Sequence, residues 1–157
     1  MEEEKDSWGA FAADVETVLD RIERYPAGNV GIFHEEKLIG KCIWQPVMKI
    51  YNDWHQNVSR NNLNLSRRFW NQRDAYVINF DVRPSYRGTG AADELMKFTI
   101  DSMRQDGIQT LYLGGRNVAQ NSTFYQRHLT PMRTIDNYWP EDKESAGKGI
   151  LYKRDIL

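Results

Sequence analysis

The sequence predicts a mixed α+β domain in which helices flank a central mixed sheet with one parallel pair of strands at its middle. Two observations lead to this fold class. Apolar runs of strand length alternate with amphipathic segments of helix length along most of the 157 residues. One helical segment joins two strand-like runs, and a crossover of this kind makes the joined strands parallel neighbours. The length favours a single domain over residues 1–157.

The first expected elements are a helix and a hairpin. Apolar residues recur at helical spacing between residues 8 and 25, and Asp6 or Ser7 is expected to cap this helix. Two β-like runs then occupy residues 29–44. The polar residues 34–37 between them predict a hairpin turn.

Residues 45–74 interrupt the regular pattern, which returns after them. They are rich in Asn, Arg and aromatic residues, and we expect loops and short helices there. The expected later elements are a strand at 75–82, a helix at 91–104, a strand at 108–115, a short helix at 119–128, and strands at 132–139 and 149–156. The buried face of the 91–104 helix is predicted to be Ala92, Leu95, Met96, Thr99, Ile100 and Met103.

Composition and charge argue against several functional classes. The formal net charge is −1, so no global field draws the chain to nucleic acid or to a membrane. The acidic start MEEEKDSW has no apolar core and is not expected to be a signal peptide. The single cysteine, Cys42, cannot form an internal disulfide or a cysteine-rich metal site, so it is expected to be a core residue. These features favour a cytoplasmic protein.

The stretch Arg87-Gly88-Thr89-Gly90-Ala91-Ala92 lies between a predicted strand and a predicted helix. Amide groups in the first turn of a helix have no intrahelical partner and form its positive end. Glycine lets a ligand approach the backbone, and Arg87 adds a fixed cation. The turn therefore predicts a cradle for a phosphate or a diphosphate. The alternative is a helix start whose glycines only allow tight packing; the P-loop and dinucleotide fingerprints do not fit.

The wider stretch VINFDVRPSYRGTGAADELM resembles the signature of the GCN5-related N-acetyltransferases, the GNAT family, which bind acetyl-CoA. The family motif Arg/Gln-x-x-Gly-x-Gly/Ala is matched by residues 87–92. A second family element is a strand, an Asn and then a helix with an aromatic-Tyr pair. Residues 108–128 match it, with Phe124-Tyr125 as the pair. The hairpin GIFHEEKLIGKCIW resembles the family's second and third strands, so the resemblance extends from residue 29 to the C-terminus.

The resemblance implies a GNAT-like fold that binds acetyl-CoA as cosubstrate and no metal. The CoA diphosphate is then expected on Arg87, Gly88, Thr89, Gly90, Ala91 and Ala92. The pantetheine is expected between the 75–82 and 108–115 strands, where a backbone N–H near Asp81 or Val82 donates to the thioester carbonyl oxygen. Asn117 and Asn121 compete for one hydrogen bond to the pantetheine. Capping of the next helix is the alternative role for Asn121.

In this family an amine attacks the thioester directly, which calls for a base that deprotonates the amine and an acid that protonates the leaving thiolate. Tyr125 matches the family's tyrosine and is the predicted acid; the alternative is a packed aromatic side chain. Asp81 is the predicted base; the alternative is an ion pair with Arg83 or Arg87. His55 is a further candidate base, against the alternative of a surface histidine.

Two departures from the family concern the acceptor side. The family's first strand is missing, which leaves a sheet edge to cover and suggests a homodimer. Residues 45–74 form a longer link than usual, and we expect them to determine acceptor specificity. Their rings and cations either stack a base and bind an anion, or form a lid with packed rings and exposed arginines. The residues concerned are Trp54, Arg67, Arg68, Phe69, Trp70 and Arg73.

The sequence thus predicts an acetyl-CoA-dependent N-acetyltransferase that acts on a primary amine of a small molecule or a protein. Two other classes remain open. One is a non-catalytic CoA-binding or protein-interaction module with the same fold. The other is a nucleic-acid-binding module that uses the basic 45–74 segment, which a steep salt dependence of DNA or RNA binding would indicate. No membrane partner is expected, because no apolar run approaches the roughly 18 residues of a span.

Overall fold

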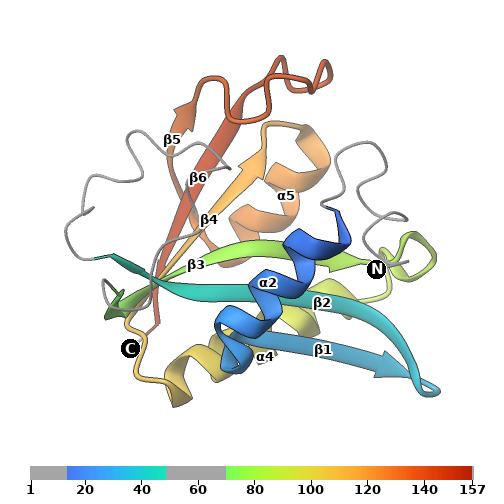
Figure 1. Cartoon of the computed structure of the whole chain (residues 1–157). Helices are drawn as coiled ribbons and strands as arrows, with labels where there is room; N and C mark the ends of the chain where they lie inside the picture. The colour runs from blue at the N-terminus through green and yellow to red at the C-terminus, as the bar shows by residue number, and fades with distance from the viewer. Residues whose placement is uncertain (1–13, 49–69, 157) are drawn as a thin grey trace. The chain divides into compact units, whose positions relative to one another are not determined.

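The computed structural model describes residues 14–48 and 70–156 (Figure 1). Their strands form one six-stranded mixed sheet with the order β1-β2-β3-β4-β6-β5. Because β3 and β4 run parallel, the predicted fold class with its parallel pair is confirmed. The strands are β1 (Asn29–His34), β2 (Lys37–Met48), β3 (Trp70–Val82), β4 (Thr110–Arg116), β5 (Thr130–Ile135) and β6 (Gly149–Asp155). The helices are α2 (Val15–Arg24), α4 (Ala91–Gln105) and α5 (Ala119–His128), with 3₁₀ turns η2 (Pro26–Gly28) and η6 (Pro84–Tyr86).

The chain divides into two compact units, each described here by itself. The first comprises Met1–Gln45 and Val77–Asp106, and the second comprises Pro46–Tyr76 and Gly107–Leu157. The strand β3 contributes to both. The predicted single domain stays a prediction. None of the described helices is long and apolar enough to cross a membrane.

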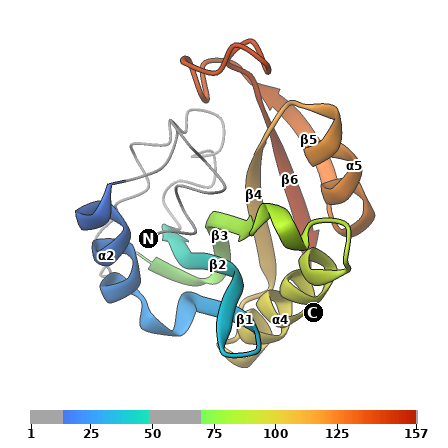
Figure 2. The same cartoon turned by 90° about the vertical axis from the view of Figure 1, so that its right-hand side faces the viewer.

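In the first unit, α2 and α4 lie on opposite sides of the β1–β2 hairpin (Figures 1 and 2). The hairpin is antiparallel, and its register runs from Asn29 opposite Ile43 to His34 opposite Lys37. Its two turn residues, Glu35 and Glu36, both have positive φ, 48° and 64°. This is the backbone of a two-residue hairpin turn, which confirms the turn expected at residues 34–37.

The helix α2 begins at Val15, and the side chain of Asp14 caps it by accepting from Thr17 N at 2.7 Å. The expected caps, Asp6 and Ser7, lie outside the described residues. The apolar side chains of α2 differ in burial, because Val18 is 2% exposed whereas Leu19 is 47% exposed. Helical spacing therefore located this helix but did not identify its buried face.

The helix α4 matches its prediction at both ends and along nearly all of its buried face. It runs from Ala91 to Gln105, and Gly107 follows with a φ of 76°. One expected core residue is wrong: Ala91 is buried in place of Ala92. The reason is geometric, since Ala91 is four residues before the buried Leu95 and so lies on the same side of the helix.

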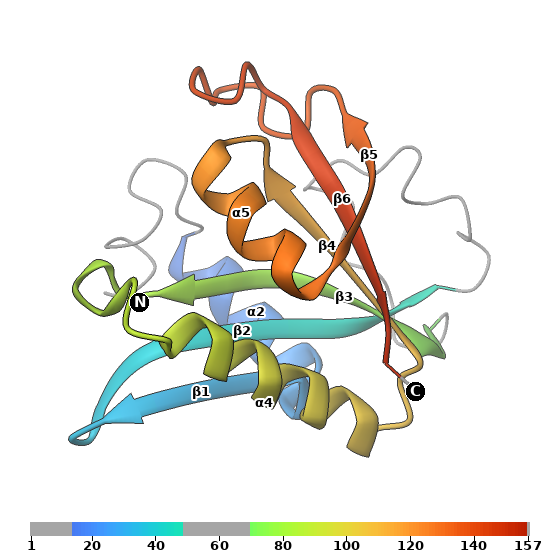
Figure 3. The ribbon, with the colours of Figure 1, turned by 180° about the vertical axis from the view of Figure 1, so that it is seen from behind.

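In the second unit, α5 packs on β4 and β5, and β6 runs antiparallel between those two strands (Figure 3). The strand predicted at 132–139 exists, but its predicted bounds are wrong, because β5 spans Thr130–Ile135. The chain turns instead at Asn137, whose φ is 53°. Tyr138 and Trp139 are each 4% exposed, so they belong to the core from within a loop. Because both side chains are apolar, the sequence pattern resembled that of a strand.

The expectation of loops and short helices over 45–74 is wrong at both ends of that segment. The strand β2 continues to Met48, and β3 already begins at Trp70. Neighbouring strands of the sheet are hydrogen bonded, and this pairing extends a strand beyond its alternating apolar pattern. Residues 49–69 lie outside the described residues.

Candidate functional site

The turn between β3 and α4 needs its two glycines for their backbone conformation. Gly88 has a φ of 74°, and Gly90, the N-cap residue of α4, has a φ of 90°. A Cβ added at either glycine would meet no atom within 4 Å. Tight packing is therefore not the reason for glycine here. Glycine is needed here for its left-handed backbone conformation, and the missing side chains leave open space beside the turn.

The N-terminus of α4 lacks a side-chain cap, because its N-cap residue, Gly90, has no side chain that could accept a hydrogen bond. The first intrahelical bond runs from Glu94 N to Gly90 O at 3.1 Å. A helix of 15 residues presents the positive end of its dipole at such a terminus. Asp93 and Glu94 lie in the first turn of α4, so they place negative charge at the same positive helix end that would attract a bound anion.

Arg87 is the exposed cation of this turn, and hydrogen bonds hold the turn in place. Arg87 Nε donates to Val82 O at 3.2 Å. Thr89 Oγ1 donates to Tyr86 O at 2.5 Å. Arg83 ties the start of the turn to β2, since its backbone N donates to Ile39 O at 2.9 Å. Arg87 thus lies three residues before Gly90, the N-cap of α4, with its Nε tied to the end of β3, and its fork of donors suits a phosphate.

Asp81, the predicted base, is only 5% exposed near the end of β3. It is close to Cys42, which has no exposed surface. Burial is the main cause that raises the pKa of the Cys42 thiol to about 12. A hydrogen bond with Thr99 lowers this pKa, and the negative charge of Asp81 raises it. Cys42 is thus an inert core thiol, as expected. Whether Asp81 acts as a base stays a prediction.

Tyr125, the predicted acid, lies on α5 and is 8% exposed. Its ring packs over Gly115 of β4: a Cβ added there would lie 2.9 Å from Tyr125 Cε2 and 3.3 Å from Tyr152 Cε2. The Tyr125 and Tyr152 ring centroids are 5.3 Å apart. Phe124 contacts the Tyr125 ring edge-on, also at 5.3 Å between centroids. Packing therefore fixes the Tyr125 ring. A fixed ring is compatible both with the predicted catalytic acid and with a packed aromatic side chain.

The neighbouring glycine, Gly114, makes room for a second pair of tyrosines. A Cβ added at Gly114 would lie 2.5 Å from Tyr138 Oη and 2.6 Å from Tyr76 Oη. These two hydroxyls hydrogen bond to each other. Burial first, and then the Tyr138 hydroxyl, raises the pKa of Tyr76 well above its ordinary value. Consecutive residues of a strand face opposite sides of the sheet, so the two glycines serve two separate tyrosine pairs.

The two asparagines occupy different positions. Asn117 directly follows β4, is exposed, and its backbone N donates to Lys148 O at 3.1 Å. Asn121 is the third residue of α5 and is half-buried. Its alternative role as a helix cap is wrong, because Val118 is the N-cap residue and no side chain caps α5. A contact of either side chain with a ligand stays a prediction.

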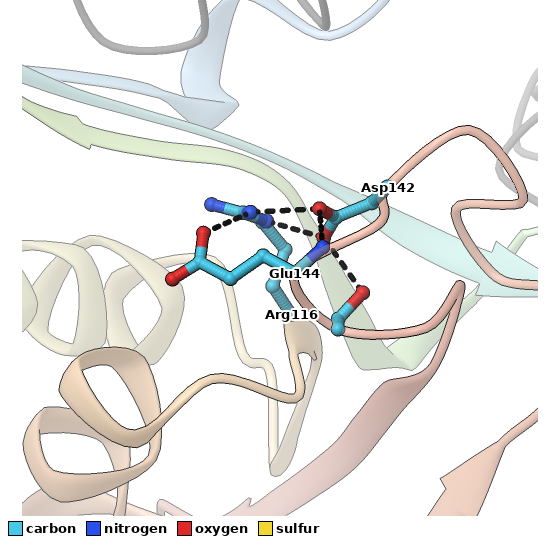
Figure 4. A network of polar contacts seen from close by, with 4 residues as sticks. Arg116, Asp142 and Glu144 are labelled. Atoms are coloured by element: carbon cyan, nitrogen blue, oxygen red, sulfur yellow. Dashed lines mark hydrogen bonds and ion pairs between the residues drawn. The ribbon is translucent and has the colours of Figure 1, made fainter.

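Sequence reasoning missed an ion-pair network at the end of β4 (Figure 4). Arg116 donates to the Asp142 carboxylate from Nε at 2.7 Å and from a terminal nitrogen at 2.9 Å. It also reaches Glu144 Oε2 at 2.8 Å. Ser145 Oγ donates to Asp142 Oδ2 at 2.6 Å. An arginine at a strand end together with an acid-rich loop was the available signal, but sequence does not say which acid folds back.

The candidates Trp54, His55, Arg67, Arg68 and Phe69 lie outside the described residues, whereas Trp70 is the first residue of β3. Arg73 belongs to β3 and is exposed. Among residues 14–48 and 70–156, no three His, Cys, Asp or Glu side chains form a group that could hold a metal ion. The described candidates divide between the units: residues 81–92 belong to the first, and Asn117, Asn121 and Tyr125 belong to the second.

Comparison with known sequences and structures gives consistent findings. The sequence model of the "Acetyltransferase (GNAT) family" matches residues 1–129. No curated protein matches the chain. A GNAT-like decarboxylase, GphF, in complex with isobutyryl-CoA has a TM-score of 0.86 at 17% identity, over 99% of this chain and 92% of that chain.

Two further structures show the same likeness. The loading GNATL domain of CurA from Lyngbya majuscula has a TM-score of 0.82 at 18% identity, over 99% of this chain and 90% of that chain. The ribosomal-protein-S18-alanine N-acetyltransferase from Escherichia coli has a TM-score of 0.68 at 19% identity, over 99% of this chain and 84% of that chain. At these identities the likeness concerns the fold.

Proposed function

Because the chain belongs to the GNAT family of acetyltransferases, we propose that it moves an acetyl group from acetyl-CoA to a primary amine by direct attack. The observation that carries this proposal is the turn at Gly88 and Gly90. Both glycines hold a left-handed backbone at the uncapped start of α4, with open space beside them. In this proposal all 157 residues act as one acyltransferase domain.

The turn suits the CoA diphosphate on three physical grounds. The first-turn amides of α4 are donors aimed out of the helix, and the dipole favours negative charge there. The Arg87 guanidinium, held by Val82 O, adds a full positive charge. The absence of a Cβ at both glycines lets phosphate oxygens approach the backbone. Arg87 offsets the repulsion that Asp93 and Glu94 add from the first turn.

The chemistry then requires one bond to form and one to break. The amine nitrogen attacks the thioester carbon, the C–S bond breaks, and the sulfur leaves with the bonding electrons. We assign to Tyr125 the proton that this thiolate takes up, and to Asp81 the removal of a proton from the amine. Since Asp81 is 5% exposed, we expect the amine proton to reach it through a water. A backbone N–H near Val82 donates to the developing oxyanion.

The acceptor is proposed to be a primary amine of a small molecule or of a protein. The Escherichia coli structure is named for acetylation of a ribosomal protein's alanine, which makes a peptide N-terminus a suitable first probe. The GphF structure is named a decarboxylase, so malonyl-CoA belongs in the same screen. Carbon dioxide release from malonyl-CoA without amine acylation would contradict N-acetylation.

The first test is thermal unfolding with acetyl-CoA, followed by a thiol-release screen of amines. At a ligand concentration of about 100 times Kd, binding adds about 2.7 kcal/mol, which raises Tm by about 5–10 °C. Arg87→Glu should abolish this rise. Lys97→Glu is the matched control, because Lys97 is an exposed cation on the same helix and should keep the rise. Binding without release of free thiol for any amine would favour the non-catalytic CoA-binding module.

A further inference from the structure

The hydroxyl of Tyr152 lacks an explanation in terms of packing alone. Tyr152 lies on β6, has no exposed surface, and its hydroxyl has no hydrogen-bond partner among the described residues. A buried hydroxyl without a partner costs free energy, and phenylalanine would fill the same space without that cost. A tyrosine at this position therefore points to a role for its oxygen.

The surroundings of Tyr152 connect that oxygen to the predicted acid. The Tyr152 and Tyr125 ring centroids lie 5.3 Å apart, with the ring planes at 46°. Both ring edges also lie over Gly115, where a Cβ would crowd Tyr125 at 2.9 Å and Tyr152 at 3.3 Å. The register of β6 fixes Tyr152 opposite Leu113 of β4. Tyr152 is thus held rigidly beside Tyr125 by the sheet beneath α5.

We propose that Tyr152 is a positioning residue for Tyr125. Its hydroxyl donates a hydrogen bond through one water to the Tyr125 oxygen when that oxygen gives its proton to the departing CoA sulfur. The Tyr125 O–H bond breaks and an S–H bond forms. The Tyr125 phenolate then regains a proton from water, and Asp81 releases to water the proton that it took from the amine. This assignment rests on the proposed function, in which Tyr125 is the acid.

The experiment compares Tyr152→Phe with wild type at saturating amine and varied acetyl-CoA. Removal of a donor to a developing negative charge should lower kcat by about 10- to 100-fold. The KM for acetyl-CoA should change less than about twofold, since the hydroxyl does not contact CoA in this proposal. The alkaline limb of the kcat profile should move to higher pH, because loss of the donor disfavours the Tyr125 phenolate.

Two further variants separate positioning from structure. In Tyr125→Phe, adding Tyr152→Phe should cause no additional loss of kcat, because the second residue acts through the first. Tyr112→Phe is the control, a half-buried tyrosine on the neighbouring strand β4, and it should keep wild-type kcat. The Tm of Tyr152→Phe should equal or exceed that of wild type, since no hydrogen bond is lost.

The outcomes distinguish this assignment from the proposed function. A Tyr152→Phe protein with wild-type kcat and an unchanged pH profile overturns the assignment alone. An additive loss in the double variant does the same. A wild-type protein that binds acetyl-CoA but releases no thiol with any amine overturns the proposed function and the assignment with it.

Discussion

Asp142→Asn removes one buried charge from a partly exposed ion-pair network without a large change in side-chain shape. The Asp142 side chain is 3% exposed and accepts two hydrogen bonds from Arg116, at 2.7 and 2.9 Å. It also accepts from Ser145 Oγ at 2.6 Å and from Glu144 N at 3.2 Å. An asparagine keeps one oxygen acceptor but loses the negative charge and the bidentate pairing.

The structure sets the expected magnitude. Breaking a buried ion pair by removal of one partner costs about 3–5 kcal/mol. Arg116 is 21% exposed and retains Glu144 at 2.8 Å, so the cost should lie below that range. We therefore expect the free energy of unfolding at pH 7 to fall by about 2–3 kcal/mol, with a Tm lower by about 4–12 °C.

The pH dependence has a definite sign. Arg116 is the main cause that holds the pKa of Asp142 well below its usual range, although burial opposes it. A carboxyl with a lowered folded pKa stabilises the fold above its ordinary pKa of about 4 and loses that contribution as the pH falls through the folded value. The stability difference between wild type and Asp142→Asn should therefore stay constant from about pH 8 to 5 and shrink below about pH 4.

Urea unfolding followed by circular dichroism at pH 7, 5 and 3 measures this difference. Asp136→Asn is the matched control, because Asp136 is an exposed aspartate in the same β5–β6 connection. It should change stability by less than about 0.5 kcal/mol at each pH. A loss below that value for Asp142→Asn at pH 7, or a loss that does not shrink at pH 3, would refute the reasoning.

Two other predictions concern the first unit. Replacing Glu35-Glu36 by Asn-Gly should raise the free energy of unfolding by about 1–2 kcal/mol, because both residues hold a positive φ that Asn and Gly adopt at lower cost. Urea unfolding measures this change. An unchanged or lower urea midpoint would argue against strain at this turn. Cys42 should resist a thiol reagent such as Ellman's reagent at pH 8 in the native protein and react fully in urea, because burial raises its pKa to about 12. Rapid labelling of the native protein would contradict that.

Local chemistry determined the start of α4 and the glycine turn before it, which the sequence predicted. The helix α4 begins at Ala91 as expected, since Gly90 readily adopts the left-handed conformation at the N-cap and the amphipathic pattern begins directly after it. Gly88 and Gly90 have the positive φ that the phosphate cradle needs, and this property belongs to the residues themselves. The role of that cradle in binding CoA stays a prediction.

Contacts between distant segments decided what sequence could not. Apolar pattern placed a strand at 132–139, but the chain turns at Asn137 so that Tyr138 can meet Tyr76 across Gly114. The pairing of Arg116 with Asp142 joins residues 26 positions apart, and no local pattern selects that acid among its neighbours.

The sequence by itself thus determined the alternation of elements, the fold class and the glycine turn, because propensity, periodicity and positive φ act within a few residues. Only the tertiary structure decided where strands end, that Tyr138 and Trp139 are buried from within a loop, and that Tyr152 lies beside Tyr125. Those outcomes depend on which segments pack together, and packing energy exceeds local preference wherever the two conflict.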